Sequence, residues 1–146
     1  IVQEQIRVAS GLPLQYTQED IILEGHAFEC RINAEDPYNF IPSPGLIESC
    51  HLPGGFGVRV DSHIYQGYRI PPNYDSLIGK ICVHGKTREQ AMAKMRVAMA
   101  ELAITGIKTN TALHRDLFAD PGFQEGGVSI HYLEKWLEAR KAKHNS

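Results

Sequence analysis

One arginine lies in the middle of the most regular alternating stretch of the chain. Side chains of a β-strand point to alternate faces, so residues two apart share a face and are spaced by about 6.5–7 Å. One face of this stretch would carry Glu29, Arg31, Asn33 and Glu35. The other face would be mostly apolar and carry His26, Phe28, Cys30 and Ile32. An arginine stays charged, and its planar fork of donors suits a carboxylate, bicarbonate or a developing oxyanion.

A polar face of this kind is more often the solvated surface of a sheet than a binding site. The turn signals that crowd around it favour a site, because they predict a rim where loops and Arg31 converge. Tyr74-Asp75-Ser76 follows a Pro-Pro turn, and two interpretations of Asp75 stay open. It is either part of a local Asx-type turn or a carboxylate that holds Arg31.

The glycine-rich segment at 53–57 could be read as a phosphate cradle. It lacks the G-x-x-x-x-G-K-[ST] pattern and no helical pattern follows it, so a tight hairpin is the better interpretation. Phe56 in this turn would be exposed or packed on a partner, and Arg59 lies three residues further on. An exposed aromatic residue beside an arginine is the composition of an interface anchor.

The rest of the composition excludes several classes of site and partner. The seven histidines are scattered without a ligand spacing, so no metal site is expected. The three cysteines form no C-x-x-C pair; buried free thiols are expected, which is usage typical of a reducing compartment. A net charge of -2 gives no general case for binding nucleic acid or an anionic membrane. No apolar run reaches the roughly 20 residues that span a bilayer, so we expect a cytoplasmic protein.

The first half of the chain predicts mostly strands, and the second half predicts helices. Turn signals delimit candidate strands at 21–34, 46–52, 57–60, 64–70 and 77–83. An amphipathic helical pattern at 1–9 precedes them. This order favours an α+β fold, with helices packed on a mostly antiparallel sheet.

The helical half begins with a predicted capping box at Thr87 and Gln90, whose side chains can satisfy otherwise unpaired backbone N–H groups. The buried face of that helix would consist of Ala91, Met95, Ala98 and Leu102. Thr109 or Asn110 can cap a shorter helix that stops at 120–122, and a last helix runs from about Ile130.

These stretches resemble, in order along nearly the whole chain, the motifs of biotin carboxylases. Residues 25–36 read G-H-A-F-E-C-R-I-N-A-E-D and are similar to the family pattern G-H-A-x-E-x-R-I-N-A-E-D. The further matches are P-S-P-G at 42–45, P-G-G at 53–55, R-V-D-S at 59–62, P-P-N-Y-D-S-L-I-G-K at 71–80 and G-I-K-T-N at 106–110. The short ending, with no biotin-carrying segment, resembles the free-standing bacterial subunit of acetyl-CoA carboxylase. Propionyl-CoA and pyruvate carboxylases share these motifs.

The resemblance implies that residues 1–146 are the C-terminal domain of an ATP-grasp carboxylase. Biotin carboxylases use ATP and Mg²⁺ to activate bicarbonate as carboxyphosphate and then carboxylate biotin on a carrier protein. By resemblance, Arg31 contacts biotin and stabilises its enolate. The implied partners are a biotin carboxyl carrier protein, a carboxyltransferase component and a second copy of the enzyme, in the first step of acetyl-CoA carboxylation for fatty acid synthesis.

The resemblance carries over two further pairs of residues. Ile130 and His131 match a short I-H segment that lies against the adenine of ATP, with Ile130 as an apolar wall. Phe56 and Arg59 match the homodimer contact of the bacterial enzymes, which agrees with the interface composition noted above.

Several motifs of the family do not occur in this sequence. It has no glycine-rich phosphate loop, no paired carboxylates suited to Mg²⁺ and no E-H-P-V-T-E segment, which in the family precedes a helix like residues 1–9. We therefore expect a detached piece that is inactive alone. Two alternatives stay open: a module that docks a carrier protein without nucleotide, and another bicarbonate-activating ATP-grasp ligase, although such ligases lack the R-I-N-A-E-D and P-P-N-Y-D-S combination.

Overall fold

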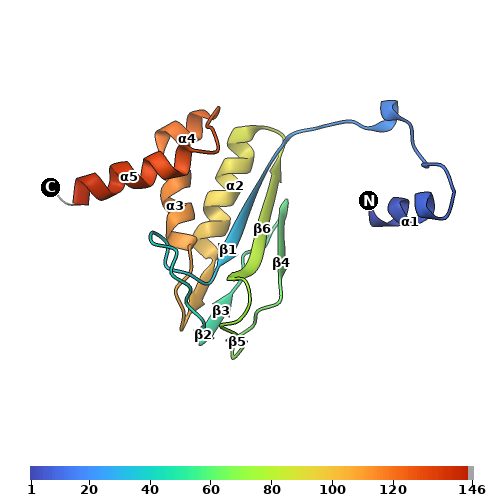
Figure 1. Cartoon of the computed structure of the whole chain (residues 1–146). Helices are drawn as coiled ribbons and strands as arrows, with labels where there is room; N and C mark the ends of the chain where they lie inside the picture. Colours follow the sequence, from blue (N-terminus) through green and yellow to red (C-terminus); the bar gives the residue numbers. More distant parts are fainter. Residues whose placement is uncertain (145–146) are drawn as a thin grey trace.

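The computed structural model describes residues 1–144, and its centre is a three-stranded antiparallel sheet (Figure 1). The strands lie in the order β1 (His26–Asn33), β6 (Leu77–Gly85) and β4 (Val58–Ser62). The other strands are β2 (Gly45–Leu46), β3 (Ser49–His51), β5 (Arg69–Ile70) and β7 (Ala103–Thr105). The helices are α1 (Val2–Ala9), α2 (Arg88–Glu101), α3 (Thr111–Ala119), α4 (Pro121–Glu125) and α5 (Tyr132–His144), with a 3₁₀ turn η1 at Gln18–Asp20.

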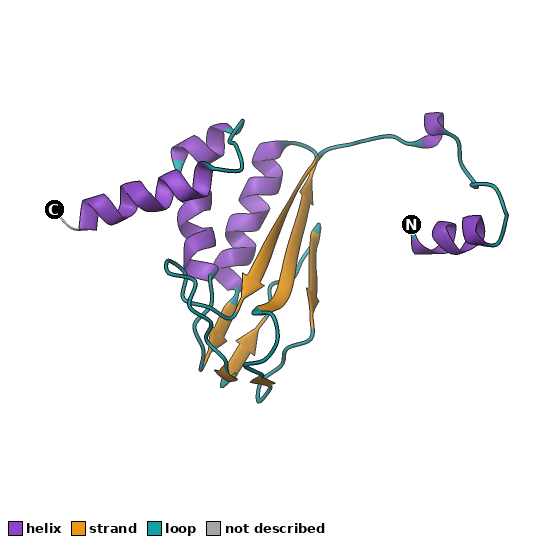
Figure 2. Cartoon of the chain, viewed as in Figure 1, coloured by secondary structure: helices purple, strands orange, loops and turns teal. Residues whose placement is uncertain are grey.

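The core lies between this sheet and helix α2, which packs on β6 and β1. Cys30 and Ile32 of β1 point into the core, as the alternation predicts. The predicted helical face of Ala91, Met95, Ala98 and Leu102 is buried. Figure 2 shows the helices α2 and α3 gathered on one side of the sheet. The predicted α+β fold is therefore confirmed, and the opposite face of the sheet stays open.

Two predicted strands are shorter or more divided than expected. The predicted strand at 46–52 is split into β2 and β3, because the N–H of Ile47 bonds to the Tyr68 carbonyl and that of Glu48 to the Thr105 carbonyl. The chain thus changes partner in mid-run, from β5 to β7. The predicted strand at 64–70 keeps only its last two residues, since Tyr65 to Tyr68 closes a turn.

The segment before β1 is exposed and does not pair as a strand. The strand predicted from residue 21 begins at His26, and Ile21, Ile22 and Leu23 are 52%, 73% and 95% exposed. Helix α1 buries none of its residues. Figure 1 shows this N-terminal segment extending away from the sheet. No helix within residues 1–144 has both the length and the apolar character needed to cross a membrane.

The helix ends show which local signals predicted the structure correctly. Thr87 caps α2, accepting a bond from the Gln90 N–H at 3.3 Å. The Gln90 side chain reaches back one residue further than a capping box, to the Lys86 N–H at 3.1 Å. The predicted stop at 120–122 ends α3 but also starts α4, because the Asp120 side chain accepts from the Phe123 N–H at 2.9 Å.

Candidate functional site

The open face of the sheet carries charged and polar side chains from all three strands. The antiparallel register aligns Glu29 with Cys82 and Arg59, and it aligns Arg31 with Lys80 and Asp61. The opposite face carries the apolar partners of the same strands. The predicted polar face of β1 is therefore real, and it is extended by β6 and β4.

Arg31 lies on this open face with its guanidinium largely in solvent. Its Nε atom is 3.4 Å from Oε1 of Glu29, and the two side chains are 65% and 45% exposed. An ion pair with this exposure contributes about 0–1 kcal/mol. The guanidinium is therefore available to an anion or a developing oxyanion without the loss of a strong interaction.

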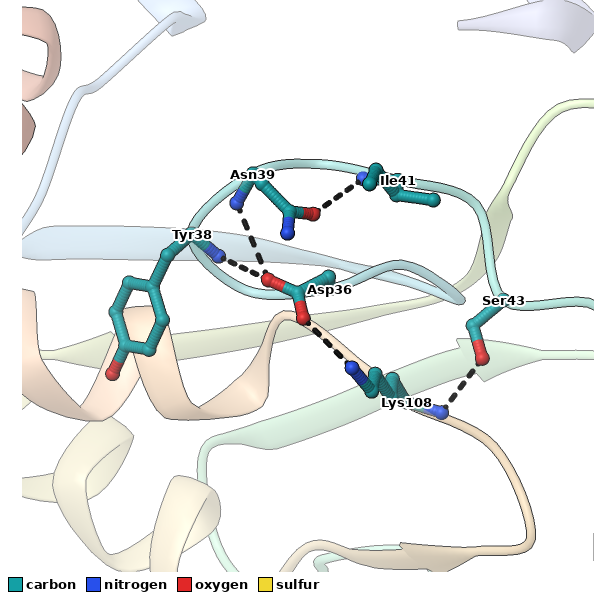
Figure 3. A network of polar contacts seen from close by, with 6 residues as sticks. All are labelled: Asp36, Tyr38, Asn39, Ile41, Ser43 and Lys108. Atoms are coloured by element: carbon teal, nitrogen blue, oxygen red, sulfur yellow. Dashed lines mark hydrogen bonds and ion pairs between the residues drawn. The ribbon is translucent and has the colours of Figure 1, made fainter.

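The loop after β1 brings together motifs that are far apart in the sequence, as Figure 3 shows. One carboxylate oxygen of Asp36 accepts from the N–H groups of Tyr38 and Asn39, at 3.1 and 3.2 Å. The other is 3.0 Å from Nζ of Lys108, whose own N–H bonds to Oγ of Ser43 at 3.0 Å. The hydrogen bond from Lys108 lowers the pKa of Asp36, so the carboxylate stays charged. The R-I-N-A-E-D, P-S-P-G and G-I-K-T-N motifs thus meet at one end of β1.

The P-P-N-Y-D-S motif joins the same cluster through Ser76. Its Oγ donates to Oε2 of Glu35 at 3.1 Å, and its carbonyl accepts from the Ala34 N–H at 2.7 Å. Asp75 accepts from the Leu77 N–H at 2.7 Å, which is the local turn that the sequence left open. Within the described residues, the ion pair of Arg31 is with Glu29. The role of Asp75 toward Arg31 stays a prediction.

The glycine-rich turn at 53–57 connects β3 to β4 but is not a hairpin. These two strands pair with β7 and β6 and not with each other, so the hairpin prediction is wrong. Gly57 has a φ of +76°, which suits glycine. Phe56 is 100% exposed, and Arg59 pairs on its own strand with Asp61 at 3.0 Å. Phe56 and Val97 border a surface hollow over α2.

Ile130 and His131 lie in the turn before α5, away from the open face. Ile130 is 92% exposed, and Nδ1 of His131 is 3.3 Å from the Glu134 carboxylate. Asp120 fastens the helix behind them, because it accepts from the Tyr132 hydroxyl and, at 3.1 Å, from Nε1 of Trp136. The bond from Tyr132 lowers the pKa of Asp120.

The structure adds two residues near Arg31 that were not predicted for the site. Asn110 occupies the N-cap position of α3 but makes no capping bond with its side chain. Its amide bonds instead to the backbone of β1, and His114 contacts the same strand. The only sequence signal was the G-I-K-T-N motif that ends at Asn110.

The sequence predictions for the cysteines and the potential metal ligands can be compared with their positions in the structure. Among residues 1–144 no group of three or more His, Cys, Asp or Glu side chains is placed to hold a metal ion. All three cysteines are free thiols. Cys30 is buried as predicted, whereas Cys50 and Cys82 are only half-buried.

Comparison with known proteins shows which family has both this fold and these motifs. A family model described as the biotin carboxylase C-terminal domain matches residues 29–135. The chain belongs to this family. It is 60% identical over 137 residues to a biotin carboxylase of Pseudomonas aeruginosa, covering 94% of this chain and 30% of that protein. It is 47% identical to a pyruvate carboxylase subunit of Methanothermobacter thermautotrophicus, covering 93% of this chain and 28% of that protein.

Solved structures agree with this family assignment. A biotin carboxylase of Campylobacter jejuni in complex with a β,γ-ATP ligand superposes with a TM-score of 0.87 at 45% identity, covering 92% of this chain and 30% of that one. The biotin carboxylase domain dimer of the Hydrogenobacter thermophilus 2-oxoglutarate carboxylase, with MgADP, ADP and bicarbonate, gives 0.85 at 46% identity, covering 90% and 29%. The expected fold is confirmed, and the chain spans about 30% of the length of the curated family members it matches.

Proposed function

We propose that this chain is the C-terminal part of a biotin carboxylase, an ATP-dependent ligase that carboxylates carrier-bound biotin with bicarbonate. The observation that carries the proposal is the position of Arg31. It lies in the family motif, on the open face of the sheet, beside the cluster where three other family motifs meet. The remainder of the active site would be supplied by the rest of the enzyme.

The proposed role of Arg31 is to bind biotin and stabilise its enolate during carboxyl transfer. A fixed cation beside a developing oxyanion, shielded from water, lowers the barrier by several kcal/mol. The planar guanidinium can donate two bonds to one oxygen-bearing group. The open face provides such a cation, and the rest of the enzyme would provide the shielding.

ATP, Mg²⁺ and biotin are the proposed cofactors. The Hydrogenobacter domain was solved with MgADP and bicarbonate, which supports ATP and Mg²⁺ for this family member. Ile130 and His131 would contact the adenine, and their exposure fits a role toward a ligand held by another domain. The phosphate and metal ligands would lie outside residues 1–146, so we expect no biotin-dependent ATP hydrolysis by this chain alone.

The proposed partners are a biotin carboxyl carrier protein, a carboxyltransferase component and a second copy of the enzyme. The dimeric state of the Hydrogenobacter domain supports the last of these. Relatives that are 60%, 56% and 55% identical are biotin carboxylases, which favours the subunit of acetyl-CoA carboxylase in fatty acid synthesis. The three free thiols favour a cytoplasmic location.

The proposal is tested by replacing Arg31 in the full-length enzyme. Arg31→Ala should lower the rate of biotin carboxylation by about 10²-fold or more, measured as labelled bicarbonate fixed on biotin. Arg31→Lys keeps the charge but not the fork, and should recover only part of the rate. Arg69→Gln, at an exposed arginine of β5, is the control. A rate for Arg31→Ala within twofold of wild type would contradict the proposal.

A pyruvate carboxylase component is the second candidate, because the Methanothermobacter relative is 47% identical over nearly the whole chain. Reconstitution with each carboxyltransferase, followed by identification of the carboxylated product, separates the two. A simple carrier-docking module is distinguished by a pull-down with biotinylated carrier protein. Binding that does not depend on the rest of the enzyme or on nucleotide would favour the docking module.

A further inference from the structure

The strand that carries Arg31 lies at the edge of the central sheet. β1 pairs with β6 on one side only, since the strand order is β1-β6-β4. Within residues 1–144, no strand pairs with the backbone groups on its other side. Unpaired backbone groups at a partly buried edge are destabilising, so something else has to satisfy them.

The start of α3 satisfies this edge with a single asparagine. Nδ2 of Asn110 donates to the carbonyl of Arg31 at 3.0 Å, and its Oδ1 accepts from the N–H of Asn33 at 2.9 Å. The backbone N–H of Asn110 donates to the carbonyl of Asn33 at 3.2 Å. Asn110 is only 6% exposed. Asn110 therefore makes the backbone hydrogen bonds that a neighbouring strand would make with β1 at Arg31 and Asn33.

One helical turn later, His114 contacts the same carbonyl. Its Nε2 atom is 2.9 Å from the Arg31 oxygen. A carbonyl oxygen only accepts, so Nε2 carries the proton and donates it. Desolvation lowers the pKa of His114 below its usual value, which favours the neutral ring. The carbonyl of Arg31 is thus held by two donors from α3.

We propose that Asn110 and His114 are positioning residues for Arg31, which fix the backbone from which the guanidinium reaches its substrate. This inference rests on the proposed role of Arg31 toward biotin. The side chain of Arg31 is largely exposed and has one weak ion pair, so its own contacts do not fix it. The position of Arg31 therefore depends on the hydrogen bonds that hold its backbone carbonyl. Oxyanion stabilisation depends on a donor that is already in place.

A purely structural role for these bonds predicts a different result. Loss of a contact between α3 and β1 would then lower stability, and any change in activity would affect the use of ATP and biotin alike. A positioning role lowers the biotin-dependent kcat and leaves the KM for ATP unchanged. Comparing the change in the biotin-dependent kcat with the change in the KM for ATP therefore separates a positioning role from a structural one.

The test uses the full-length enzyme with two replacements of the same residue. His114→Phe keeps a ring but removes the donor, and should lower the kcat of biotin carboxylation about tenfold, with the KM for ATP within twofold of wild type. His114→Gln restores a donor and should recover most of the rate. Asn110→Asp keeps the acceptor for Asn33 but places a carboxylate oxygen against the Arg31 carbonyl, and should behave like His114→Phe.

Arg115→Met is the matched control, because Arg115 ties α3 to the carbonyls of Met99 and Leu102 and makes no bond to β1. Arg115→Met should lower the melting temperature without a selective loss of the biotin-dependent kcat. If His114→Phe does not fold, His114→Asn, which is too short to reach the carbonyl, takes its place. The inference is overturned if the His114 variants impair the use of ATP and of biotin equally, or if they impair neither. If Arg31→Ala is also fully active, the proposed function fails with it; if Arg31→Ala is inactive, only the positioning role fails.

Discussion

Arg31 is held at its backbone and left free at its guanidinium. The carbonyl accepts from Asn110 and His114, whereas the side chain forms an exposed ion pair with Glu29. A residue that binds a transient ligand needs both properties. The backbone contacts reduce the conformational freedom that binding would otherwise have to remove, and the weak pair leaves the charge available.

Cys30 and Cys82 lie on opposite faces of the sheet, and their reactivity should differ accordingly. Burial raises the pKa of Cys30 to about 12, so its thiol stays protonated and shielded. We expect native protein at pH 8 to leave Cys30 unalkylated by iodoacetamide while Cys82, on the open face, reacts at least tenfold faster. Peptide mapping by mass spectrometry measures both sites. In urea the two should react alike, and rapid alkylation of Cys30 in the native state would contradict its burial.

At the scale of the elements, regular periods predicted α2 and most of β1, although the predicted strand began at residue 21 and β1 begins at His26. An apolar run between turn signals predicted β6. Sequence patterns failed at 46–52 and 64–70, where strand length depends on partners elsewhere in the chain. The N–H groups of Ile47 and Glu48 bond in opposite directions, to Tyr68 and Thr105. No local property of residues 46–52 contains that information.

The residues of the candidate site also fall into those that a local sequence pattern predicted and those that depend on tertiary contacts. Arg31 was predicted because its motif is a continuous run of residues. Asn110 and His114 were not predicted for the site, since their contact with β1 depends on how α3 packs across the sheet. The local rule for helix starts predicted Thr109 or Asn110 as a cap; Asn110 occupies that position, but its side chain bonds to the edge of the sheet instead. A tertiary contact outweighed a local preference.

Tyr132 and Trp136 of helix α5 donate hydrogen bonds to Asp120, and this contact can be tested by fluorescence. Asp120→Ser keeps a side chain able to cap α4 but is too short to reach Tyr132 and Trp136. We expect a red shift in the emission of Trp136, the single tryptophan of the chain, and a raised KM for ATP in the full-length enzyme. Thr87→Ala, at the cap of α2, is the control: it should lower stability by about 1 kcal/mol without either change. An unchanged spectrum for Asp120→Ser would contradict this attachment.

At the scale of the whole molecule, two of the regions that expose apolar side chains lie far apart in the sequence. One is the N-terminal segment, which extends away from the sheet in Figure 1. The other is the turn between β3 and β4, where Phe56 lines the same surface hollow as Val97 of α2, and the two side chains are 100% and 57% exposed. A fully exposed phenylalanine contributes little to the stability of its own chain. It gains stabilisation when a partner covers it.

The second region should therefore carry the contact between two copies of the enzyme. Phe56→Ser should raise the dimer dissociation constant of the full-length enzyme at least tenfold, because about 1.5–3 kcal/mol of apolar burial is lost. The stability of each protomer should not change, since Phe56 contacts solvent within its own chain. Sedimentation velocity over a range of concentrations measures the dissociation, and Ile41→Ser, at a 62% exposed isoleucine elsewhere, is the matched control. If both variants dimerise as tightly as wild type, the contact between copies lies on another surface.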